Sequence, residues 1–158
     1  MNYQRSYTPM RPAYSPTGRT AFAGRPIKSF QDLEVYQKLL AISVTLAKRL
    51  APSVIAKPLS GCGNLTTLAL DLPVKIATAH SLRFSDQTKA IQILEEIMLS
   101  CNILIVYLEQ YRDLENTDIE TEFFVEQIKS ILTVRGKILR LQFSWKKFSQ
   151  QYKNQQNA

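Results

Sequence analysis

Residues 85–148 contain one glycine and no proline, and this shortage of helix breakers constrains the fold more than any other feature of the sequence. Four of the seven prolines lie in the first 28 residues, so the rest of the chain is also poor in breakers. Glycine and proline destabilise helix interiors, and long segments without them are typical of α-helices. With only five glycines in 158 residues, an all-β chain full of tight turns is disfavoured.

Apolar residues recur at helical spacing in four segments, at residues 30–50, 64–82, 85–114 and 118–148. Ser29 and Asp32 have the spacing of an N-terminal cap for the first helix. Pro52 is expected to end that helix, because the residue before a proline disfavours the α region. Pro73 is expected to kink the second helix. Short loops between helices of this length predict an all-α, up-down-up-down four-helix bundle over residues 29–150.

The two ends of the chain differ from this body. Residues 1–28 are rich in proline, arginine and tyrosine without helical or strand periodicity, and are expected to form a disordered basic tail. Residues 151–158 are expected to form a polar C-terminal tail. An inert linker is the alternative for the N-terminal tail, whose tyrosines could instead stack on RNA bases.

Charge is unevenly distributed along the chain, whose net charge is +7. Residues 1–28 carry five basic groups and residues 127–158 carry seven, and neither segment contains an acid. Such asymmetry indicates an anionic partner for the ends, or contact between the ends of one subunit and the middle of another.

The sequence predicts neither a disulfide framework nor a membrane span. Cys62 and Cys101 form no CxxC motif, which favours a reducing cytoplasm. The N-terminus lacks the apolar region of a signal peptide. The most apolar run, at residues 97–108, is shorter than the ~20 residues that a bilayer requires, so we expect a buried helix there.

No catalytic or metal-binding constellation is evident in the sequence. His80 is the only histidine, and its position near the end of the second helix suggests either a surface residue or one that interacts with the dipole at the helix C-terminus. No cysteine or histidine pair has zinc spacing, and Gly61-Cys62-Gly63 indicates a turn rather than a phosphate loop. Glu95 and Glu96 are expected to lie on a solvated face. We therefore expect neither an enzyme nor a bound cofactor or metal.

The last helix carries two apolar stripes. The first follows a/d spacing and should enter the bundle core: Ile131, Val134, Ile138, Leu141, Trp145 and Phe148. The second is expected to pack against another subunit, with the glycine allowing close approach: Ile128, Leu132, Gly136, Leu139 and Phe143. The alternative is one wide core face with a few exposed apolar residues.

Basic residues occupy the remaining face of the last helix, and others lie in the N-terminal tail. On the helix, one polar sector holds four of them and two more flank the second stripe: Lys129, Lys137, Arg140 and Lys147, then Arg135 and Lys146. The tail contributes Arg5, Arg11, Arg19, Arg25 and Lys28. These residues are predicted to contact the phosphates of RNA in a salt-dependent manner. An ordinary solvated face is the alternative for the helix.

Three segments of the chain resemble a known family. "SFQDLEVYQKLL" (29–40) is similar to the opening helix of the bacterial four-helix-bundle proteins named after large-ribosomal-RNA intervening sequences. "TTLALDLPVKIATAH" (66–80) resembles their second helix in Pro73, Ile76 and Ala77 but departs at Lys75, Thr78 and Ala79. "EFFVEQIKSILTVRGKILRL" (122–141) resembles their last helix, and the resemblance covers roughly residues 29–145.

The same bundle is used by the accessory variability determinant of diversity-generating retroelements. Gly136 and Trp145 in the last helix are similar to that branch. The resemblance implies a homopentamer that binds a reverse transcriptase and its template RNA and supports mutagenic cDNA synthesis. The alternative branch implies a structural or protein–protein assembly module. A peripheral membrane protein is a third reading, against which the regular a/d stripe argues.

Overall fold

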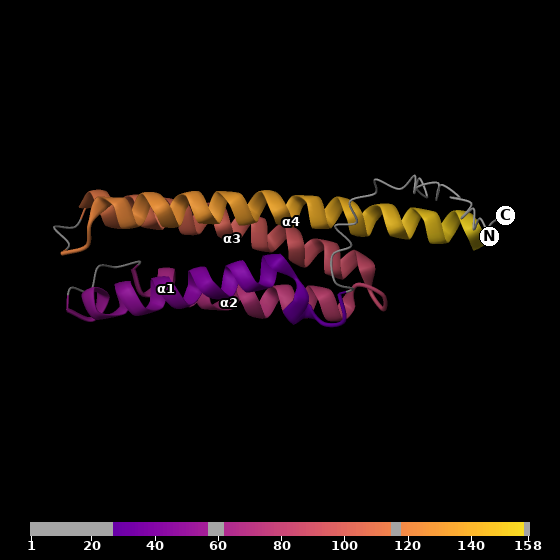
Figure 1. The fold of residues 1–158 in the computed structure, drawn as a ribbon, viewed down its shortest axis with the longest axis horizontal. Helices are drawn as coiled ribbons and strands as arrows, with labels where there is room; N and C mark the ends of the chain where they lie inside the picture. The colour runs from indigo at the N-terminus through magenta and orange to yellow at the C-terminus, as the bar shows by residue number, and fades with distance from the viewer. Residues whose placement is uncertain (1–26, 57–61, 115–117, 157–158) are drawn as a thin grey trace, which may run out of the picture.

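The computed structural model describes residues 27–56, 62–114 and 118–156, and within these residues the chain is helical without strands (Figure 1). The elements are a 3₁₀ turn η1 (Phe30–Asp32) followed by α1 (Glu34–Ala56), α2 (Cys62–Leu82), α3 (Gln87–Leu114) and α4 (Thr121–Gln156). Helices that follow one another in the chain pack side by side, and α4 packs against α1. The predicted all-α four-helix bundle is confirmed.

The chain enters the bundle through the predicted capping residues. The Ser29 side chain accepts a hydrogen bond from the Gln31 N–H at 3.2 Å, and the Asp32 carboxylate accepts from the Ser29 N–H at 2.9 Å. Backbone donors at Ser29 and Lys28 lower the pKa of Asp32. The cap is confirmed, but it lies at the N-terminus of η1 rather than of α1. Leu33 is extended (φ −71°, ψ 123°), and α1 begins at Glu34.

The prediction that Pro52 ends the first helix is wrong, since α1 continues through Pro52 to Ala56. A proline in a helix interior removes one backbone hydrogen bond and crowds the preceding turn, but tertiary packing can hold the helix across it. Leu46 and Leu50 are fully buried in the turns just before Pro52 and provide that packing. As expected, the second helix contains Pro73 in its interior and ends at Leu82, and the kink at Pro73 stays a prediction.

The core is built from one apolar stripe of each helix. All four helices contribute side chains with no exposed surface, among them Leu39, Leu46, Leu65, Leu94, Leu104, Leu108, Ile131 and Ile138. In α4 the predicted a/d residues Ile131, Val134 and Ile138 are fully buried, and Leu141 and Trp145 pack against the core while half-buried. The assignment of these five residues to the core is therefore confirmed.

The C-terminal end of α4 differs from the prediction. Phe148 was expected in the core but is 60% exposed, and the helix expected to end there continues to Gln156. Figure 1 shows the reason: α4 extends beyond the turn that joins α2 to α3, so no neighbouring helix covers this part. Residues 151–156 of the predicted polar tail are thus helical, and residues 157–158 lie outside the described residues.

His80 is buried, with 7% of its surface exposed, so the surface alternative is wrong, whereas its expected place at the C-terminal end of the helix is confirmed, since it lies in the last turn of α2. The centre of its ring lies 6.5 Å from that of Trp145, which packs against the core from α4. The Arg83 guanidinium lies 3.1 Å from His80 Nδ1 and donates to the His80 carbonyl at 2.6 Å. Burial, and secondarily the Arg83 charge, lower the pKa of His80, so the ring is neutral in the fold at pH 7.

This environment predicts a pH-dependent stability. Because the pKa of His80 is lowered on folding, the unfolded chain binds a proton that the folded chain excludes as the pH falls below about 6.5. The melting temperature, followed by circular dichroism, should fall between about pH 7 and pH 5 in the wild type and fall less in His80→Gln. Equal pH dependence in both proteins would contradict the lowered pKa.

Candidate nucleic-acid interface

The basic residues of α4 divide between the two seams that α4 makes with its neighbours. Lys137 Nζ lies 2.9 Å from the carboxylate of Glu34 on α1. On the other side, Lys146 Nζ lies 3.7 Å from the carboxylate of Glu95 on α3. Gln142, buried beside it, donates to the same carboxylate at 2.8 Å. This division agrees with the angles expected from the sequence.

Two of the α4 cations are open to a partner. Arg140 and Lys147 are exposed, and neither makes an ion pair within the described part of the chain. Within the described residues, the one polar contact of Arg140 is a long hydrogen bond, 3.4 Å, from its Nε to the Gly136 carbonyl. Lys129 is also exposed and lies on the same polar sector of the helix. Residues 127–156 of α4 contain no aspartate or glutamate.

Arg135 is less available than the sequence suggested. It is half-buried, and its Nε is enclosed without a hydrogen-bond partner in the described residues. It faces Cys101 on α3, whose burial raises the pKa of the thiol to about 12, with Arg135 opposing part of that effect. Cys101 is therefore an un-ionised core residue. The Arg135 Nε is therefore not available to a phosphate.

The tail residues of the predicted interface are only partly described. Lys28 is exposed. Its backbone N–H donates to the Asp32 carboxylate at 2.8 Å, and this bond does not involve the ammonium group of the side chain. Arg5, Arg11, Arg19 and Arg25 lie outside the described residues, and the prediction that the tail contacts RNA remains a prediction.

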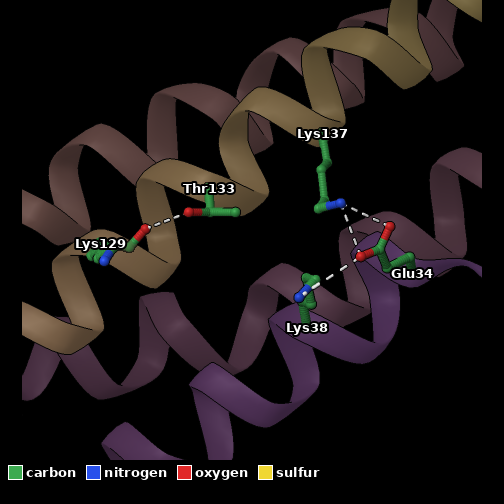
Figure 2. Close-up of polar contacts among 5 residues, drawn as sticks. All are labelled: Glu34, Lys38, Lys129, Thr133 and Lys137. Carbon is green, nitrogen blue, oxygen red and sulfur yellow. Dashed lines mark hydrogen bonds and ion pairs between the residues drawn. The ribbon is translucent and has the colours of Figure 1, made fainter.

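A groove at the α1/α4 seam was not predicted from the sequence. It measures about 330 Å³ and is lined by Lys38, Ala41 and Ile42 of α1 and by Lys129, Ser130 and Thr133 of α4. Figure 2 shows the Glu34 carboxylate joined to both Lys38 and Lys137, and the Thr133 hydroxyl joined to the Lys129 carbonyl, to which it donates at 2.8 Å. Sequence reasoning missed Lys38 because its proximity to α4 depends on a pairing of segments about 90 residues apart.

The predicted second stripe of α4 lies on the surface of the single chain. Leu132 and Phe143 are 54% and 60% exposed, whereas Ile128 and Leu139 are half-buried against the core. A Cβ added at Gly136 would meet nothing within 4 Å. The stripe is therefore uncovered at its centre, and the packing of this chain alone does not require a glycine there.

Further exposed apolar residues, not named in the sequence prediction, lie on both halves of the bundle. The α3/α4 half adds Leu99, Ile103, Val106 and Val125, and the α1/α2 half carries Leu40, Val44, Leu70 and Val74. The nearly continuous apolar sequence of α3 was a signal for this, since a helix with only two helical neighbours cannot bury apolar residues on all sides.

The described residues contain no candidate metal site, but they contain one helix that could span a membrane. Within them, no three histidine, cysteine, aspartate or glutamate side chains gather closely enough to hold a metal ion. One helix, residues Gln87–Asp113 of α3, is long and apolar enough to cross a membrane by length and composition, contrary to the estimate from residues 97–108 alone. Its buried stripe of Leu94, Leu104 and Leu108 agrees with the core helix of a soluble bundle.

Comparison with known proteins gives no match: the sequence fits no family model, and neither a curated protein nor a solved structure is significantly similar to it.

Proposed function

We propose that this protein is a non-catalytic, oligomeric RNA-binding accessory protein of a diversity-generating retroelement, acting in the cytoplasm. It binds the reverse transcriptase and the template RNA and thereby supports mutagenic cDNA synthesis. The retroelement, the reverse transcriptase and the pentameric state come from the resemblance in residues 29–145. The observation that carries RNA binding is the surface of α4 from residue 127 onward, which contains no acid and exposes Lys129, Arg140 and Lys147.

Oligomerisation is supported by exposed apolar residues on two different halves of the bundle. Leu132 and Phe143 belong to the α3/α4 half, and Leu70 and Val74 belong to the α1/α2 half (Figure 1). When two different surfaces of one subunit meet head to tail, the contact generates a closed ring if the rotation closes. A ring of subunits would repeat the cationic surface of α4 and suit it to a long polyanion.

Charge reversal on α4 tests RNA binding. The double variant Arg140→Glu/Lys147→Glu should bind a labelled RNA about 25-fold more weakly at ~100 mM salt, because two phosphate contacts are lost. The slope of log K against log salt concentration should become shallower by about 1.4. Fluorescence anisotropy at several salt concentrations measures both quantities.

The matched control is Lys48→Glu/Lys89→Glu, which changes the net charge equally but at exposed positions on α1 and α3. Equal losses in the two double variants would mean that total charge, and not the α4 surface, determines RNA affinity. Unchanged affinity in Arg140→Glu/Lys147→Glu would exclude this surface as the interface.

A purely structural assembly module is the second candidate, favoured by the same exposed apolar residues of α3 and α4. It requires an oligomer that retains its protein partner but has no measurable affinity for RNA at ~100 mM salt, where phosphate contacts still register. Wild-type RNA binding in the anisotropy experiment distinguishes the two candidates.

A further inference from the structure

The α1/α4 groove combines an apolar floor with a polar, cationic rim. Ala41 and Ile42 of α1 provide apolar surface, and Ile42 is buried. Lys38 stands on one wall, and Lys129, Ser130 and Thr133 form the other. The rim therefore offers two ammonium groups and the Ser130 hydroxyl as hydrogen-bond donors to an anion, because the Thr133 hydroxyl already donates to the Lys129 carbonyl.

The Glu34 carboxylate forms ion pairs with two lysines at this seam, Lys38 and Lys137. Glu34 lies 2.9 Å from Lys137 Nζ and 3.7 Å from Lys38 Nζ (Figure 2). Lys137 is the main cause that lowers the pKa of Glu34, so this carboxylate is ionised at neutral pH. Three lysines and one acid leave a net charge of +2, and Lys129 makes no ion pair within the described residues.

We infer that the groove, together with Lys137 and Glu34 at the edge of the same seam, forms a phosphate-binding site, in which a phosphate group takes the place of Glu34 as the partner of Lys38 and Lys137. Lysine ammonium groups bind phosphate as point charges, and the Ser130 hydroxyl, about 10 Å before Lys137 along α4, can donate to a neighbouring phosphate of the same nucleic acid. The Glu34 carboxylate then acts as an internal competitor, because it neutralises the two lysines that the phosphate requires. Its side chain is 60% exposed and is free to turn into solvent when it is displaced.

The continuation of the same face along α4 indicates that the phosphate belongs to a polymer. Beyond Lys137 this face carries Arg140, Ser144 and Lys147 without any acid. An isolated phosphate would need only the groove, whereas successive phosphates of an RNA backbone would use the whole face. This assignment rests on the proposed function and adds to it a specific site, which includes Lys38 of α1.

Two single substitutions test the site and should act in opposite directions. Lys38→Ala removes one phosphate contact and should weaken RNA binding about five-fold at ~100 mM salt. Glu34→Gln removes the competing charge and should strengthen RNA binding by a similar factor, about five-fold. Both are measured by fluorescence anisotropy of labelled RNA, with circular dichroism spectra to verify that each variant is folded.

The controls carry the same charge changes at exposed positions outside the groove. Lys48→Ala on α1 matches Lys38→Ala, and Glu122→Gln on α4 matches Glu34→Gln. Groove variants that behave like their controls would overturn the site, while the loss of affinity in Arg140→Glu/Lys147→Glu would still support RNA binding by α4. Opposite shifts in the groove variants alone would support the site.

If the protein binds no RNA, the proposed function is wrong. A second probe, inorganic pyrophosphate, then tests whether the groove binds phosphate. In a ¹H–¹⁵N NMR titration with inorganic pyrophosphate, shifts of the Lys38, Ser130 and Thr133 amides that are lost in Lys38→Ala would assign the groove to a free phosphate compound. Absence of such shifts would overturn the phosphate site itself.

Discussion

Leu104→Ala is expected to lower the free energy of unfolding by about 3 kcal/mol, in a range of roughly 2–5 kcal/mol. Leu104 is fully buried on α3, which packs against both α2 and α4. The smaller side chain loses apolar burial and leaves a cavity that a bundle held by three other helices cannot close completely. Urea denaturation followed by circular dichroism measures the change.

Gln110→Ala is the matched control, because it introduces the same alanine into the same helix at an exposed position. Its effect should stay within about 0.5 kcal/mol. If Leu104→Ala were as mild as Gln110→Ala, Leu104 would not lie in the core between α3 and its two neighbours, and the arrangement of the four helices would be wrong.

Phe143→Asp is expected to dissociate the oligomer, so that the mass measured by light scattering falls from a multiple of the subunit mass to the 18.0 kDa of one chain. Phe143 is 60% exposed at one end of the second stripe of α4. A carboxylate placed in an apolar interface loses its hydration without gaining a partner, which destabilises the assembly far more than the subunit.

Ser144→Asp provides the control, since the neighbouring exposed residue receives the same charge but lies about 100° away around the helix. The mass of this variant should remain that of the wild type. A wild-type mass of 18.0 kDa would show that the protein is a monomer and would exclude the ring. Dissociation by both variants would show that charge anywhere on this part of α4 disrupts the assembly.

Periodicity predicted the fold well because helix formation and core placement are local properties of the sequence. The spacing of Ile131, Val134 and Ile138 alone identified the buried face of α4, and Ser29 with Asp32 identified the entry to the bundle. The ends of the helices were less predictable. Whether α1 continues past Pro52 depends on the packing of Leu46 and Leu50, which no local rule contains.

The candidate site was predicted in part, for a related reason. The cations of α4 and their two angular sectors could be derived from one helix. The groove could not, because it requires Lys38 and Lys129 to face each other across two helices. The burial of His80 depends on its contact with Trp145 of α4. The exposure of Phe148 depends on α4 extending beyond the other helices.

The α1/α4 seam has a consequence for the motions of the bundle. Its edge is joined by exposed ion pairs between residues far apart in the chain, Arg49 with Glu120 at 2.8 Å and Lys137 with Glu34 at 2.9 Å. Exposed ion pairs contribute only about 0–1 kcal/mol each, and their attraction weakens as salt screens it. Partial opening of the native state should therefore begin where the first and last helices meet, and the groove can widen around a ligand while the other three seams remain closed.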